Sequence, residues 1–313
     1  MPSITILDTP HVYELTAPTD PKLPVLVFIH GWLLSRHYWQ PVVELLQSEY
    51  QCLIYDARGF GESQIVRRSR NSDLATTSAS ESSVASANSY SSLNAEDIAK
   101  NHQSYSLNAY AEDLKYLLES LAIESAWVIG HSLGGSVALW AADLYPEVIK
   151  GAICLNAGGG IYLKEEFERF RNVGQKLVKF RPRWLSYIPL LSLIFSRMMV
   201  ARPLHSKWGR QRVLDFIKAD EDAALGALLE STTEAEVHSL PQLVARLKQP
   251  VYFIAGDQDM VMEIKYVNHL ASFHHLFAST ESNVFQIDNC GHLGMVEAPE
   301  EVAAIVTRIL GKY

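Results

Sequence analysis

The chain has 313 residues, of which 48% are hydrophobic and 20% are charged, and its formal net charge is −8. This composition fits a soluble globular protein with a large core, arranged as one large α/β domain or two smaller ones. No basic region followed by an apolar stretch opens the sequence, so we expect no secretory signal. The most apolar stretch, residues 184–203, is interrupted by Arg197, so we expect no membrane-spanning helix.

The chain contains three cysteines, Cys52, Cys154 and Cys290. Their odd number and the lack of C-x-x-C spacing argue against a disulfide framework or a zinc site. We therefore expect a reducing, cytoplasmic compartment. We expect neither a metal ion nor an organic cofactor.

Charge is distributed unevenly along the sequence. Residues 164–212 contain twelve lysines and arginines against three glutamates, a net charge of +9, which leaves −17 for the rest of the chain. Such asymmetry indicates either a solvated basic face or a surface that binds an anionic partner.

Several short apolar runs have the composition of strands that are buried on both faces of a parallel sheet. They span residues 25–30, 52–57, 126–131, 151–156, 251–256 and 283–288. Segments of helical periodicity lie between most of them. This alternation predicts an α/β fold, a mostly parallel, doubly wound sheet with helices on both faces. The early segments 3–7 and 11–15 are expected to add an antiparallel edge.

Two segments interrupt the alternation. Residues 64–104 are rich in serine, asparagine and alanine and lack apolar periodicity, which predicts a disordered surface insertion without a catalytic role. Residues 158–240 are helical, basic and apolar, and we interpret them as a cap over the carboxyl edge of the sheet. The predicted core then comprises residues 1–157 and 241–313.

A G-x-S-x-G pentapeptide occupies residues 130–134, directly after a strand-like run and before a helix-like one. A sharp strand-to-helix turn holds such a serine in a strained conformation, with its hydroxyl above the sheet at a helix N-terminus. This context predicts that Ser132 is a nucleophile.

A serine nucleophile needs a base, and the base needs an orienting acid. On a sheet of this type the acid and then the histidine follow the serine along the chain, in loops at the carboxyl ends of strands. Asp257 and Asp259 end one strand-like run, and His292 follows the next. We predict His292 as the base and prefer Asp259 as the acid because it lies deeper in its loop, whereas Asp257 is expected to shape the turn.

Acyl transfer also needs an oxyanion hole. We predict that its donors are the backbone N–H groups of Leu133, next to the nucleophile, and of Trp32, in the loop after the first core strand. The Trp32 indole and His131 are expected to line the substrate pocket.

Together these motifs resemble the α/β hydrolase fold family, in its serine esterase and lipase-like branch with a helical cap. The matching residues are 30–32, 56–63, 130–135, 256–259 and 291–292. The resemblance implies an α/β hydrolase fold, Asp259 as the acid, and a structural role for residues 56–63 beside the site. It covers residues 24–63, 105–157 and 240–313, and reaches the cap only by position.

The resemblance leaves several reactions open. Family members with an aspartate nucleophile, the haloalkane dehalogenases and epoxide hydrolases, are disfavoured because that position is Ser132. Ester hydrolysis is preferred over carbon–carbon cleavage of the menaquinone-pathway type. It is also preferred over cofactor-free perhydrolysis, whose pattern often carries a proline where this chain has Leu33. A ligand receptor without catalytic activity is the alternative from another class.

The cap segment provides the main indication of substrate and partner. It mixes basic residues with many aromatic and aliphatic ones, a combination typical of contact with an anionic membrane surface. It equally suits a pocket for a lipophilic acyl or prenyl chain, or simple packing on the core. We expect a small-molecule or lipid ester as substrate and no nucleic acid, since no recognised nucleic-acid-binding module is present.

Overall fold

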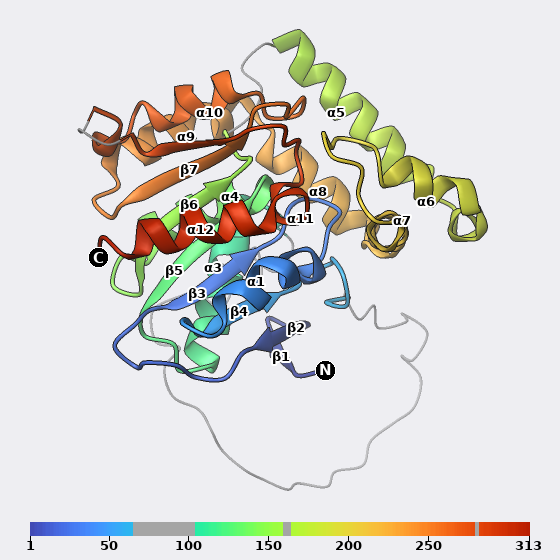
Figure 1. Ribbon diagram of the computed structural model, residues 1–313. Coiled ribbons are helices and arrows are strands. Elements are labelled where there is room, and N and C mark those ends of the chain that lie inside the picture. Colours follow the sequence, from blue (N-terminus) through green and yellow to red (C-terminus); the bar gives the residue numbers. More distant parts are fainter. Residues whose placement is uncertain (65–103, 159–163, 279–281) are drawn as a thin grey trace, which may run out of the picture.

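The computed structural model describes residues 1–64, 104–158, 164–278 and 282–313 (Figure 1). Its centre is an eight-stranded sheet in the order β1-β2-β4-β3-β5-β6-β7-β8. The strands are β1 (Ser3–Ile6), β2 (Thr9–Leu15), β3 (Val25–Ile29), β4 (Cys52–Tyr55), β5 (Ala126–His131), β6 (Ile149–Leu155), β7 (Val251–Gly256) and β8 (Val284–Ile287). Strands β3 to β8 run parallel, and β1 and β2 form an antiparallel edge. The predicted fold class is confirmed.

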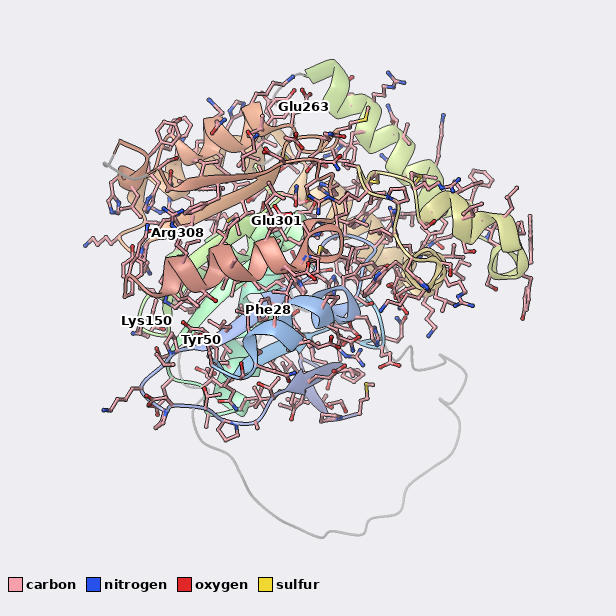
Figure 2. All side chains as sticks on the ribbon, viewed as in Figure 1. Phe28, Tyr50, Lys150, Glu263, Glu301 and Arg308 are labelled. Atoms are coloured by element: carbon pink, nitrogen blue, oxygen red, sulfur yellow. The ribbon has the colours of Figure 1, made fainter. Side chains whose placement is uncertain are left out.

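Helices cover both faces of the sheet. They are η1 (Arg36–Trp39), α1 (Gln40–Leu46), α3 (Leu107–Ser120), α4 (Leu133–Leu144), α9 (Glu234–Arg246), α10 (Ile264–Ala271), η3 (His275–Ala278), α11 (Gly294–Glu297) and α12 (Pro299–Leu310). Alternate residues of a strand point to opposite faces, so Leu26 and Phe28 join the core beneath α1 and α12, while Val27 and Ile29 join the core beneath α3 and α4. Phe28 lies within these layers, whereas charged side chains such as Glu263 lie at the outside (Figure 2).

Helix α3 illustrates how the sequence specifies these elements. The Ser106 side chain accepts a hydrogen bond from the Ala109 N–H and so caps the helix N-terminus. Apolar residues at helical spacing, including Leu107, Leu114 and Leu118, are buried against the sheet. The apolar stripe that predicts the helix is therefore the face that packs on the core.

The segment after β6 forms a run of helices that lead into α9. They are α5 (Lys164–Lys179), η2 (Arg183–Tyr187), α6 (Pro189–Phe195), α7 (Ser206–Lys218) and α8 (Glu221–Ser231). Helix α5 packs on α8 and α6 packs on α7, whereas α9 packs on α4 and α10. The predicted boundary at residues 240 and 241 falls inside α9, and the division into core and cap stays a prediction. The predicted insertion at 64–104 lies outside the described residues except at its two ends.

Within the described parts of the chain, every helix is too short or too polar to cross a membrane.

Candidate active site

Ser132 occupies the sharp turn between β5 and α4. Its backbone has φ +52° and ψ −117°, a conformation that is strained for a residue with a Cβ atom. A Cβ atom at Gly130 would lie 2.0 Å from the Gly134 carbonyl oxygen, and one at Gly134 would lie 2.4 Å from the Ile29 carbonyl oxygen. The two glycines therefore let the start of α4 approach β3 and β5, which holds Ser132 at the carboxyl edge of the sheet.

Asp259 and His292 meet at the same edge, in the loops that follow β7 and β8. The His292 Nδ1 lies 2.8 Å from Asp259 Oδ2, and each residue is only 4% exposed. The other carboxylate oxygen accepts hydrogen bonds from the N–H groups of Val261 and Met262. Burial alone would raise the pKa of Asp259, but His292 and these N–H donors lower it to about 2. A charged carboxylate thus faces Nδ1 and leaves Nε2 free to act as a base.

Asp257, the other candidate acid, lies elsewhere in the same loop. Its side chain is exposed, and its Oδ1 accepts a hydrogen bond from the Cys290 N–H at 3.1 Å. The structure therefore brings Asp259 against His292 and leaves Asp257 to hold the neighbouring turn.

His131 is 1% exposed and lies beneath the His292 loop. Its Nε2 is 2.7 Å from the His292 carbonyl oxygen, and the two imidazole rings are 4.9 Å apart between centroids. Burial, followed by the neighbouring His292, lowers the pKa of His131 to about 3. A neutral His131 donates to the loop without placing a positive charge beside His292. Its assignment to the substrate pocket stays a prediction.

Two backbone N–H groups near Ser132 are free to bind an anion. Leu133 is the first residue of α4, so its N–H has no acceptor within the helix. The N–H of Trp32 likewise donates to no described residue. Both N–H groups belong to the loops predicted to form the oxyanion hole.

His30 and the Leu34 N–H both hold the Gly31 carbonyl and so set the orientation of the Trp32 N–H. Its Nε2 accepts a hydrogen bond from the Ala57 N–H, so its Nδ1 carries the proton and donates to the Gly31 carbonyl oxygen at 2.8 Å. The C=O of Gly31 and the N–H of Trp32 belong to one planar trans peptide and point in opposite directions. Because the carbonyl points toward His30, the Trp32 N–H points away from it.

The Trp32 side chain links this loop to the helices that follow β6. Its indole N–H donates to the Ala224 carbonyl oxygen of α8 at 2.9 Å, and its ring lies 6.5 Å from the Phe170 ring of α5. One residue therefore connects a candidate oxyanion donor with α5 and α8.

Sequence reasoning missed Asn156, which follows β6. Its side-chain amide donates to Asp259 Oδ2 at 2.9 Å and to the Gly291 carbonyl oxygen at 3.1 Å. It thus ties the acid to the loop that carries His292. Its position at the end of a predicted strand, on the edge where the other site residues lie, was the available signal.

Glu297, the last residue of α11, was missed as well. Its carboxylate accepts four backbone hydrogen bonds, from Gly291 and Leu293 on either side of His292 and from Ala201 and Arg202, which lie between α6 and α7. The His292 N–H in turn donates to the carbonyl oxygen of Met199 in the same segment. Glu297 therefore joins the His292 loop to the chain that covers it.

The described residues contain no group of three or more histidine, cysteine, aspartate or glutamate side chains arranged to hold a metal ion. The acidic and imidazole side chains around Ser132 are instead paired with one another and with backbone groups. This pairing suits acid–base chemistry by the protein's own side chains.

The model of the α/β hydrolase fold family matches residues 24–299. This match covers most of the chain and all the site loops described above. The chain belongs to the α/β hydrolase fold family.

Among curated relatives, this α/β hydrolase is 23% identical over 262 residues to a bifunctional esterase/perhydrolase of Acinetobacter calcoaceticus, covering 80% of this chain and 79% of the relative. It is 25% identical over 153 residues to epoxide hydrolase 4 of Mus musculus, covering 49% of this chain and 33% of the relative. These matches support a hydrolase.

Among solved structures, this α/β hydrolase is similar to a thermophilic esterase from Thermogutta terrifontis, with a TM-score of 0.69 and 21% identity over 100% of this chain and 99% of that one. The enol-lactonase of Burkholderia xenovorans LB400 gives a TM-score of 0.69 with 16% identity, covering 99% and 100%. At these identities the likeness shows the fold alone.

Proposed function

We propose that the protein is a serine hydrolase that cleaves a carboxylic ester. The observation that carries this proposal is the buried Asp259–His292 hydrogen bond, which lies at the same sheet edge as the strained Ser132 turn. Geometry of this kind activates a hydroxyl for attack on a carbonyl carbon. An epoxide hydrolase is disfavoured, despite the similar relatives, because the position of the nucleophilic aspartate is occupied by Ser132.

In the proposed mechanism His292 Nε2 takes the proton of Ser132 as the hydroxyl oxygen attacks the ester carbonyl. The N–H groups of Trp32 and Leu133 bind the oxyanion that forms. His292 then gives the proton to the leaving alcohol. In the second half of the reaction His292 takes a proton from water, the water oxygen attacks the acyl carbonyl, and the proton returns to Ser132 as the carboxylic acid leaves. Asp259 keeps the proton on Nδ1 and stabilises the imidazolium throughout.

We propose an acyl or prenyl ester with a lipophilic chain as the substrate, bound beneath the segment 158–240 acting as a cap. Support comes from the apolar character of this segment and from its contacts with the site. Gly291 leaves no room for a Cβ atom beneath Val200 and Ala201, since such an atom would lie 2.7 Å from each. This chain therefore packs directly on the loop that carries His292, while Ser132 itself stays partly exposed.

Perhydrolysis is a second candidate, favoured by the similarity to the Acinetobacter esterase/perhydrolase. In this reaction hydrogen peroxide replaces water and attacks the acyl-enzyme, which yields a peracid. A test supplies a short carboxylic acid with hydrogen peroxide and measures peracid formation. Ester turnover without peracid would restrict the activity to hydrolysis.

The deciding experiment compares the wild type with Ser132→Ala and with Ser136→Ala, a serine one turn into α4 that serves as the matched control. p-Nitrophenyl esters of graded chain length measure turnover, and a fluorophosphonate probe labels the nucleophile. We expect Ser132→Ala to lose labelling and about 10⁶-fold of kcat, while the control keeps both.

Labelling of Ser132→Ala at the wild-type rate would overturn the assignment of the nucleophile. Absence of hydrolysis at every chain length, together with tight binding of small ligands, would instead identify a receptor. A preference for long chains would support the lipophilic substrate.

A further inference from the structure

The outer side of α5, η2 and α6 carries a concentration of exposed apolar side chains. Of the eighteen large apolar residues exposed among the described residues, ten lie between residues 173 and 199. We call these ten the outer apolar surface; they are Val173, Leu177, Phe180, Trp184, Tyr187, Leu190, Leu193, Ile194, Met198 and Met199. Apolar patches of this density mark interaction sites, whereas single exposed apolar residues need no explanation.

This surface faces away from the core. Helices α5 and α6 lie at the edge of the molecule, on the far side of α7 and α8 from the sheet (Figure 1). Tyr187 is 84% exposed, Phe180 79% and Leu190 62%. The interpretation that the segment only packs on the core therefore does not explain these side chains.

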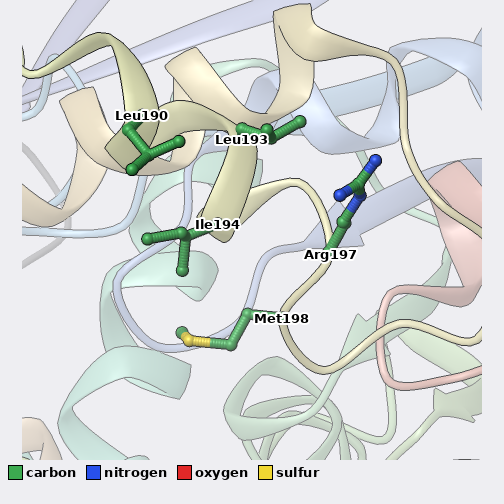
Figure 3. Close-up of a pocket in the computed structure, with 5 residues that line it drawn as sticks. All are labelled: Leu190, Leu193, Ile194, Arg197 and Met198. Atoms are coloured by element: carbon green, nitrogen blue, oxygen red, sulfur yellow. The ribbon is translucent and has the colours of Figure 1, made fainter.

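The surface contains an open hollow of about 490 Å³. Leu190, Leu193, Ile194 and Met198 line it, with Arg197 beside them (Figure 3). An apolar hollow with a guanidinium group at its side suits a ligand that has both a hydrocarbon part and an anionic group.

The segment that carries the surface is mainly positive, although the first half of α5 also contains Glu165, Glu166 and Glu168. Residues 169–214 contain eleven lysines and arginines and no aspartate or glutamate. Some of these cations are used internally; Arg181 and Arg212, for example, donate to backbone carbonyl groups. Lys176, Lys179 and Arg197 are exposed, and none of them forms an ion pair with a described carboxylate.

We propose that the outer apolar surface docks on an anionic lipid bilayer. Its apolar side chains enter the boundary between headgroups and acyl chains, and Lys176, Lys179 and Arg197 lie against the lipid phosphates. Trp184 and Tyr187 suit this depth because their rings are apolar with a polar tip. A symmetric dimer through this face is disfavoured because it would bring the cations of two copies together. Docking is independent of the reaction assigned to Ser132, so its test measures binding and not turnover.

The experiment uses the full chain and sedimented vesicles of phosphatidylcholine, with or without 30% phosphatidylserine. We expect binding to the anionic vesicles, little binding to phosphatidylcholine alone, and release at about 1 M salt. Replacing Lys176, Lys179 and Arg197 together by glutamine should weaken binding about 100-fold, since each cation contributes about fivefold. The control replaces Lys22, Lys150 and Lys248 by glutamine, the same charge change on residues outside this surface, and should bind as the wild type does.

A second measurement tests the apolar contact directly. Bromine-labelled acyl chains should quench tryptophan fluorescence, and Trp184→Phe should lose most of that quenching. Equal binding by the wild type and the triple glutamine variant, or equal quenching in Trp184→Phe, would overturn the proposal. A concentration-dependent dimer that Tyr187→Ser with Leu190→Ser abolishes, without vesicle binding, would assign the surface to a second copy.

Discussion

The side chains of the loops around Ser132 have fixed partners within the protein, whereas those of the outer apolar surface are left exposed to solvent. In the loops, Asp259, His292 and Glu297 are almost fully buried, and each has specific hydrogen-bond partners. On the outer apolar surface, Tyr187 and Leu190 are mostly exposed. Buried polar groups need partners fixed in place, whereas exposed apolar groups gain free energy only when something covers them.

This difference assigns chemistry to the loops around Ser132 and recognition of a partner to the outer apolar surface. The site loops hold their geometry in the free protein, which suits chemistry that depends on preorganised groups. The outer apolar surface is completed only by a partner, which suits recognition. Substitutions in the loops should therefore affect rate, and substitutions on the surface should affect binding.

The largest effect in the loops after removal of the nucleophile is expected from Asp259→Asn. The amide would donate to Nδ1 and hold the imidazole in the tautomer that cannot accept the serine proton. We expect kcat for ester hydrolysis to fall by about 10⁴-fold. Asp257→Asn is the control, because its Oδ1 can still accept from the Cys290 N–H. Retention of more than a tenth of the wild-type kcat in Asp259→Asn would contradict its assignment as the acid.

A smaller effect is expected from Glu297→Gln. The carboxylate now accepts hydrogen bonds from backbone N–H groups. The NH₂ group of glutamine would face some of these donors with another donor, so the His292 loop would shift. We expect kcat to fall by about 10- to 100-fold with KM little changed, as for a misplacement of about 1 Å. Glu297 acts here as a positioning residue, not a catalytic one.

Steady-state kinetics well below the melting temperature separate this role from a loss of folded protein. The matched control is Glu301→Gln, whose exposed carboxylate pairs with Arg202. A change in KM with kcat intact, or equal effects in both variants, would argue against the positioning role.

The smallest expected effect is on thermal stability and concerns the contact between α7 and the core. Ser35 Oγ donates to the buried Asp215 carboxyl at 2.9 Å, and burial raises the pKa of Asp215 from 3.8 to about 7. Between these two values the folded state keeps a proton that the unfolded state has lost, so Asp215 contributes less stability as the pH rises through this window. We expect the melting temperature of Asp215→Asn, relative to the wild type, to rise by about 2–4 °C between pH 5 and pH 8.

Melting curves at several pH values test this prediction, with Asp8→Asn in an exposed turn as the control. A constant difference between Asp215→Asn and the wild type across the pH range would show that Asp215 does not titrate in this window.

The fold could be predicted from the sequence because its signals are local. Apolar runs of strand length, with amphipathic helical segments between them, predict an α/β fold. In such a fold the loops that follow the parallel strands lie at one edge of the sheet. That topology is also why Asp259 and His292, 33 residues apart along the chain, could be paired before any contact was known. The rule that sites lie at the carboxyl ends of parallel strands applies here because it depends only on where strands end, and not on individual contacts.

The residues that support the site could not be predicted in the same way. Glu297 binds four backbone N–H groups, two of them almost 100 residues away, and backbone groups leave no pattern in a sequence. The burial of His131 depends on how the His292 loop folds over it, a contact that the sequence next to Ser132 does not reveal. Exposure of the outer apolar surface likewise depends on tertiary packing, since a helical apolar stripe predicts burial in most proteins.

The contact between Trp32 and α8 bears on the engineering of this protein. An exchange of the segment 158–240 for that of another α/β hydrolase would leave the underlying sheet untouched. Here a transplanted segment must bring a carbonyl group to the place of Ala224, or the indole of Trp32 loses its acceptor. It must also bring two N–H groups to the carboxylate of Glu297. A chimaera designed without these three groups would change its turnover number along with its specificity.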